Sequence, residues 1–195
     1  EAQGGSGANQ ANGGAIQVYG NGEKLSFYRS YVDLTNNTFY SNKANVHAGA
    51  VAQTGYNFNT TRSRMTNNIF IDNESSDARY NNIRGNDAAS NLGGNIGYDN
   101  GTASTATKEE VFGVYDIGLS TNHSSVTCGY EEAQMVPTLP IKPDGTADNV
   151  SASASVTTDQ RHFSRSTTAS DIGAVETGYS KFNANGGYFE PDDPQ

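Results

Sequence analysis

The residues able to do acid, base or metal chemistry are few and scattered. The three histidines, His47, His123 and His162, lie far apart and show no metal-ligand spacing. The only adjacent aspartates, Asp192 and Asp193, lie between prolines near the end of the chain, where we expect no rigid scaffold. A glycosidase needs two carboxylates at a set separation, and a polysaccharide lyase needs a base beside a group that neutralises a uronate. Neither set can be assigned, so we expect a non-catalytic protein.

Arginine and aromatic side chains offer binding chemistry instead. Arg62 and Arg64 alternate on one face of an expected strand, where they can contact an anionic sugar. We expect inserted loops at residues 17–33, 52–64 and 74–92 to carry specificity. Their aromatic residues, able to stack on sugars or on a partner protein, are Tyr19, Tyr28, Tyr31, Tyr56, Phe58 and Tyr80.

We expect no cofactor. The segment Gly4–Asn9 resembles the calcium-binding GGxGxD repeat, but Asn9 replaces the aspartate and no second copy follows. Calcium is the alternative left open there. Cys128 is the only cysteine, so no intrachain disulfide can form, and we interpret it as a small buried residue.

Six Asn-x-Ser/Thr sequons occur in this Asn-rich chain. Asn36 and Asn73 fall at expected corners of the fold, where a glycan would compete with packing. If the source is eukaryotic and the chain is a glycoprotein, the better acceptors are Asn59, Asn100, Asn122 and Asn149.

Composition and charge narrow the class of protein. The 195 residues are only 34% hydrophobic, yet they include 11 Tyr, 8 Phe and 22 Gly. This balance indicates a thin, repetitive core with many turns and little helix. The net charge of −9 argues against a nucleic-acid partner, because affinity for phosphates comes from clustered Lys and Arg. No apolar run is long enough to span a bilayer, so we expect no membrane insertion by this segment.

A repeated phrase specifies the elements that must position these side chains. LTNNTFYSN, residues 34–42, returns as MTNNIFIDN at residues 65–73, an offset of 65 − 34 = 31 residues. A second motif recurs at residues 13–16, 48–51 and 93–96, as GGAI, AGAV and GGNI. We interpret each coil as a strand entered through Gly, a variable turn, a strand ending at Thr-Asn-Asn and a strand centred on Phe.

Stacking explains these residue types. Strands of successive coils lie about 4.8 Å apart, so Phe39 would stack on Phe70 and Leu34 on Met65. Equivalent asparagines at the corners would form a hydrogen-bonded ladder, and glycine would permit close backbone approach. The fold class is therefore predicted as all-β, a right-handed parallel β-helix, or solenoid, with irregular coils and long inserted loops.

Two sets of motifs resemble known families. The alternating GGA[ILV] and FxxN motifs resemble the repeats of polymorphic outer-membrane proteins and related bacterial surface β-helix proteins. TDQR at residues 158–161, Arg165 and DIGAVE at residues 171–176 are similar to the closing segment of β-helix proteins called choice-of-anchor Q. The chain departs from that pattern at residues 162–164, HFS, where the family commonly has a Gly. The resemblance covers most of residues 13–176 and implies a surface-displayed solenoid followed by a variable anchoring tail.

The closing segment also has a physical interpretation. Asp159, Arg161, Arg165, Asp171 and Glu176 are five charges in a chain with 17% charged residues. Buried arginine–carboxylate pairs among them would cap the end of the apolar column and block strand addition.

These observations combine into one hypothesis about organisation and function. Residues 1–176 are expected to form the C-terminal coils of a longer β-helix, with a tail at 177–195. The protein is expected to be secreted or on the cell surface and to serve in adhesion, glycan or partner-protein binding, or self-assembly into an extracellular filament. The alternative is a fragment of a polysaccharide lyase or glycoside hydrolase on the same scaffold.

Overall fold

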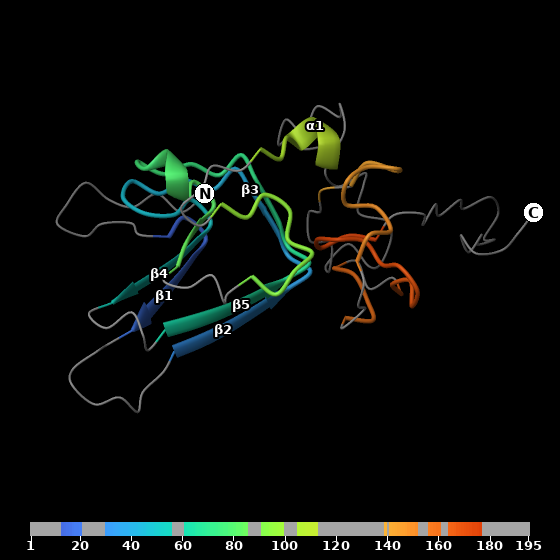
Figure 1. Cartoon of the computed structure of the whole chain (residues 1–195), viewed down its shortest axis with the longest axis horizontal. Helices are drawn as coiled ribbons and strands as arrows, with labels where there is room; N and C mark the ends of the chain where they lie inside the picture. The colour runs from blue at the N-terminus through green and yellow to red at the C-terminus, as the bar shows by residue number, and fades with distance from the viewer. Residues whose placement is uncertain are drawn as a thin grey trace, which may run out of the picture. The chain divides into compact units, whose positions relative to one another are not determined.

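Where the structure describes the chain, its regular elements are mostly strands with little helix, which confirms the predicted all-β class (Figure 1). The computed structural model describes residues 13–20, 30–55, 61–85, 91–99, 105–112, 139, 141–151, 156–160 and 164–176. The chain divides into two compact units, residues 1–108 and 109–195. The sequence does not predict this boundary, and the expected tail at 177–195 lies outside the described residues.

The first unit is built from parallel strand pairs. β1 pairs with β4 and β4 with β7, β2 pairs with β5, and β3 pairs with β6, all in parallel (Figure 1). The elements are β1 (Ile16–Gly20), β2 (Ser30–Thr35), β3 (Thr38–Tyr40), β4 (Val51–Gly55), β5 (Thr61–Thr66), β6 (Ile69–Ile71), the 3-10 helix η2 (Ala78–Tyr80), β7 (Ile83–Arg84) and the helix α1 (Lys108–Val111) at the unit boundary.

The predicted apolar columns are present. Phe39 pairs with Phe70, and their rings are stacked with centroids 5.0 Å apart and planes within 3° of each other. Leu34 pairs with Met65 in the neighbouring sheet, and both side chains are buried. Each column therefore places the same kind of side chain at the same level of successive turns of the chain.

The predicted asparagine ladder is also confirmed. The Asn37 amide donates to Asn68 Oδ1 at 3.0 Å, and the Asn68 amide donates to Asn95 Oδ1 at 3.0 Å. A second column runs from Asn42 to Asn73 at 2.9 Å and from Asn73 to Asn82 at 2.8 Å. Because each amide both donates and accepts, the column satisfies buried backbone groups while linking the turns.

The two asparagines of each Asn-Asn pair have different tasks. Asn36 and Asn67 adopt φ of 55° each, a left-handed conformation that Asn tolerates better than most residues. The second asparagine of each pair then points into the ladder. The sequence alone does not separate these two roles.

Glycine permits close approach of the backbone at one corner, as predicted. A Cβ on Gly14 would collide with the carbonyl oxygen of Gly49, and a Cβ on Gly49 would collide with that of Asn81. Gly49 N–H donates to this Asn81 carbonyl at 2.8 Å, so the close approach makes a backbone hydrogen bond.

The predicted register of the third Gly motif is wrong. Residues 93–96 do not stack beneath residues 48–51, because Ile96 pairs with Ile69 instead. Gly94 adopts φ of 67° at the level of Asn67, and Val51 pairs with Ile83. Gly and Asn both tolerate positive φ, so the Gly-Gly of residues 93–94 replaces a Thr-Asn corner rather than repeating the earlier Gly corner.

The predicted inserted loops are also partly wrong. Residues 17–33 contain most of β1 and β2, residues 52–64 contain most of β4 and β5, and residues 74–92 contain η2 and β7. The intervening residues 21–29, 56–60 and 86–90 lie outside the described residues.

The second unit differs where the structure describes it. Its isolated bridges, Ser151 with Ser170 and Thr158 with Ser164, are antiparallel. Its buried apolar side chains are Val111, Phe112, Ile141, Ala147, Ile172 and Val175. No helix among the described residues is long and apolar enough to cross a bilayer.

Candidate functional site

The structure brings some predicted binding residues onto one strand face. In the β2–β5 register, Tyr31 pairs with Arg62 and Asp33 with Arg64. Because side chains alternate along a strand, these four positions share the face opposite to that of Leu34 and Met65. The register therefore places positions 62 and 64 on the same strand face, and their contact with an anionic sugar stays a prediction.

The only described charges of that face are weakly paired. Arg64 Nε lies 3.9 Å from Asp33 Oδ1, and both side chains are more than 60% exposed. Some predicted site residues lie outside the described part of the chain. This holds for the side chains alone at Tyr19, Tyr31 and Arg62. It holds for the whole residue at Tyr28, Tyr56, Phe58, Asn59, Asn100 and Asn122.

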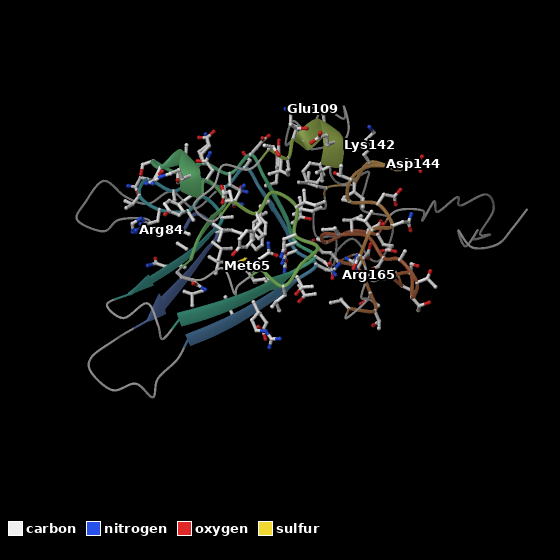
Figure 2. The ribbon with its side chains drawn as sticks, viewed as in Figure 1. Met65, Arg84, Glu109, Lys142, Asp144 and Arg165 are labelled. Atoms are coloured by element: carbon white, nitrogen blue, oxygen red, sulfur yellow. The ribbon has the colours of Figure 1, made fainter. Side chains whose placement is uncertain are left out.

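Tyr80 belongs to a second group, which we call the Arg84 cluster: His47, Arg79, Tyr80 and Arg84. The guanidinium carbons of Arg79 and Arg84 each lie 5.5 Å from the centroid of the Tyr80 ring. Arg84, labelled in Figure 2, has its Nη1 2.8 Å from His47 Nε2. The cluster thus combines η2, the end of β7 and the segment before β4.

Of this cluster, the sequence predicts only Tyr80 as a binding residue. His47 is a scattered histidine without metal-ligand spacing, and neither Arg79 nor Arg84 belongs to a predicted motif. The pairing of Ala52 with Arg84 brings β7 beside β4, and so brings Arg84 near His47. Only the correct register of the third coil would have revealed this.

The two arginines of the cluster differ in their charge partners. Arg79 holds Asp77 with two hydrogen bonds, Nε to Oδ1 at 3.0 Å and Nη2 to Oδ2 at 2.7 Å. This hydrogen bonding lowers the pKa of Asp77 and raises the pKa of Arg79. Among the described residues, no carboxylate forms an ion pair with Arg84.

The hydrogen bond with Arg84 also determines which ring nitrogen of His47 carries the proton. A guanidinium can only donate, so His47 Nε2 must accept from Arg84. The imidazole is then neutral, with its proton on Nδ1.

Asp99 is a buried carboxylate near the start of β7. It is 1% exposed and accepts the backbone N–H groups of Asn82 and Ile83, each at 2.8 Å. Burial raises its pKa from 3.8 to about 6, although these two hydrogen bonds act in the opposite direction.

The raised pKa of Asp99 predicts a pH dependence of stability. Between pH 3.8 and pH 6 the folded chain binds a proton that the unfolded chain releases. The stabilisation is therefore full below pH 3.8 and is lost as pH rises through 6. We expect the difference in unfolding free energy between wild type and Asp99→Asn to fall by about 1 kcal/mol from pH 5 to pH 7. Urea unfolding at both pH values measures it, and a difference that stays constant would contradict the prediction.

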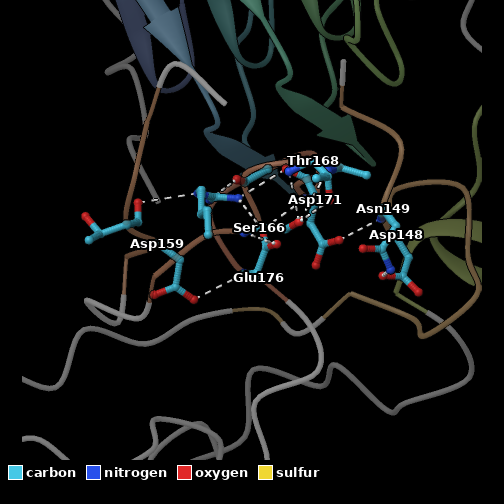
Figure 3. A network of polar contacts seen from close by, with 11 residues as sticks. Asp148, Asn149, Asp159, Ser166, Thr168, Asp171 and Glu176 are labelled. Atoms are coloured by element: carbon cyan, nitrogen blue, oxygen red, sulfur yellow. Dashed lines mark hydrogen bonds and ion pairs between the residues drawn. The ribbon is translucent and has the colours of Figure 1, made fainter. Parts of the chain in front are cut away.

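The closing segment forms a network of polar contacts that includes Asp159, Asp171 and Glu176 (Figure 3). Arg165 is its central donor. Arg165 Nη1 donates to Glu176 Oε2 and to the Asp171 carbonyl, each at 3.1 Å, and Nη2 donates to the Gly173 carbonyl at 2.6 Å. Glu176 also accepts the N–H groups of Ser166 at 3.0 Å and Asp171 at 2.9 Å. Four of the five predicted charges, Asp159, Arg165, Asp171 and Glu176, are buried in this network.

Burial lowers the pKa of Arg165, and the nearby charges of Glu176, Asp159 and Asp171 oppose that shift. The arginine joins Thr158 to residues 171–176, so its role here is structural. Arg161 lies outside the described residues. The capping of the apolar column by this network stays a prediction.

Three of the six sequon asparagines lie among the described residues. Asn36 and Asn73 are 7% and 3% exposed, consistent with their expected corner positions. Asn149 is exposed, and its Nδ2 donates to Asp148 Oδ1 at 2.8 Å.

No family model, curated protein or solved structure matches this chain. Among the described residues, no three His, Cys, Asp or Glu side chains are grouped so that they could hold a metal ion. The Gly4–Asn9 segment lies outside those residues.

Proposed function

We propose that this chain is a right-handed parallel β-helix that acts outside the cell or on its surface, binding a glycan or a partner protein. The observation that carries the proposal is the in-register parallel stacking of β1–β4–β7, β2–β5 and β3–β6. Stacked strands repeat outward side chains at about 4.8 Å, which gives a rigid face suited to a repeating polymer.

The outward side chains support a binding role. The β2–β5 face carries Asp33 and Arg64, and the Arg84 cluster carries two guanidiniums around a tyrosine. Arginine and tyrosine are favoured at recognition surfaces because both combine an apolar body with directional polar groups. The resemblance of the repeats and of the closing segment to bacterial surface β-helix proteins supports the same location.

The Arg84–His47 contact bears on the lyase alternative. A lyase needs a basic side chain beside the group that neutralises a uronate, and an arginine and a histidine do lie together here. However, His47 Nε2 already accepts from Arg84, so this nitrogen is engaged. The geometry therefore supports binding better than proton abstraction.

Incubation with a panel of polysaccharides tests the proposal. The panel holds uronate-containing, sulfated and neutral glycans, each with and without calcium, and both retention and cleavage are measured. We expect retention on at least one glycan with no new unsaturated or reducing ends. New chain ends would favour the lyase or hydrolase alternative. No retention on any glycan, together with filaments seen by microscopy, would favour a purely structural role.

A further inference from the structure

Arg84 is held in place by two contacts that leave most of its donors unused. His47 Nε2 takes one N–H of Nη1, and the Tyr80 ring attracts the guanidinium without accepting through a lone pair. Among the described residues, no oxygen accepts from Nε or Nη2 of Arg84. These two nitrogens form one edge of the planar guanidinium, which matches the two oxygens of a carboxylate.

The fixed side chain favours ligand binding. Arg84 is half-buried. Arg79 is exposed, and its Nε and Nη2 already donate to the two carboxylate oxygens of Asp77. A side chain that is already ordered loses less rotamer freedom when a ligand arrives. Arg84 is therefore the better-prepared anion receptor of the two arginines.

We propose that the Arg84 cluster binds the carboxylate of an acidic sugar. The proposal rests on the glycan-binding function above and names its ligand class and its central residue. Arg84 would hold the carboxylate through Nε and Nη2, while His47 and Tyr80 act as positioning residues.

Charge and surroundings favour an acidic sugar over other anions. The chain carries a net charge of −9, which repels polymers with densely spaced charge such as nucleic acids. A polysaccharide with one carboxylate per sugar has more widely spaced charges than a duplex nucleic acid, so it suffers less of this repulsion. The exposed Ser76 donates its hydroxyl to the carbonyl of Val46, next to His47, and its polar side chain suits a hydroxyl-rich ligand.

Binding of the full chain to polygalacturonate, measured by calorimetry, tests the site. Three other polymers serve as comparison ligands. Methyl-esterified polygalacturonate lacks the carboxylate charge, and sulfated dextran carries sulfate groups instead of carboxylates. Poly-glutamate presents its carboxylates on a peptide. We expect binding to polygalacturonate that is at least about tenfold stronger than to the other three, because a charge-assisted pair is lost or misplaced.

Variants locate the site. Arg84→Gln is expected to weaken binding about tenfold or more. Arg84→Lys keeps the charge but not the fork, so it should still bind measurably less tightly than wild type. Tyr80→Ala should weaken binding more than Tyr80→Phe, which keeps the ring. Lys43→Gln removes an exposed charge from the same unit and serves as the matched control.

The outcomes separate this site from the general function. Binding to polygalacturonate that Arg84→Gln and Arg84→Lys leave unchanged would overturn the site and preserve the glycan-binding function. Equal binding to poly-glutamate or sulfated dextran would overturn the ligand class. If no glycan binds, the site fails, and so does the glycan-binding part of the proposed function. If Arg84→Gln does not fold, by circular dichroism, the Arg84→Lys result decides.

Discussion

Replacing Arg165 by methionine is expected to destabilise the second unit by about 3–5 kcal/mol. The side chain is 2% exposed and donates to Glu176 and to the carbonyls of Asp171 and Gly173. Methionine fills similar space but has no N–H groups, so a buried carboxylate and two carbonyls lose their donor. Breaking a buried pair costs more than the pair contributes, because the remaining charge stays desolvated.

Urea unfolding, monitored by hydrogen exchange, measures this change in the free energy of unfolding of the second unit. Exchange of the Ser166 and Asp171 amides, which donate to Glu176, reports on the network itself. Lys142→Ala, an exposed change in the same unit, should alter stability by no more than about 0.5 kcal/mol. If Arg165→Met is no more harmful than this control, the network does not hold the closing segment together.

The repeat of residues 34–42 at residues 65–73 was enough to predict the contacts between these two stretches in the interior of the first unit. Phe39 on Phe70, Leu34 on Met65 and the asparagine ladder all follow from one offset of 31 residues. These features are predictable because a stacked strand places equal residues at equal levels.

The pairing of residues 91–96 could not be predicted in the same way. The offset shortens to 27 residues between Asn68 and Asn95, and Gly94 takes the left-handed conformation that Asn67 has. Two residue types that satisfy the same φ are interchangeable in the structure but look like different motifs in the sequence.

The Arg84 cluster escaped prediction for a related reason. His47 and Arg84 are 37 residues apart, and their contact depends on the register of the third coil. A scattered histidine shows its partner only when the coils are correctly aligned. The closing charges were easier to predict, because they lie within one short stretch of the chain.

Asn68→Ala is expected to destabilise the first unit by about 3 kcal/mol. The side chain is fully buried, donates to the Leu34 carbonyl at 2.8 Å and accepts the Asn37 N–H at 2.9 Å. Alanine leaves both backbone groups without these partners. Each unsatisfied buried group costs roughly 1–3 kcal/mol.

Asn37→Ala is the matched control. Asn37 is only half-buried, and the Asn68 amide would keep its bonds to Leu34 and Asn95. We expect a loss of about 1 kcal/mol for this change. Urea unfolding followed by circular dichroism compares the two variants.

A double-mutant cycle on Asn37 and Asn68 tests the stacking of successive coils most directly. These residues are 31 apart in sequence, and their side chains are joined at 3.0 Å only if the coils stack in parallel register. We predict that the double variant loses less stability than the sum of the single variants, by about 1 kcal/mol. Strictly additive losses would show that the two side chains do not touch, and would contradict the stacked-coil architecture on which the proposed function rests.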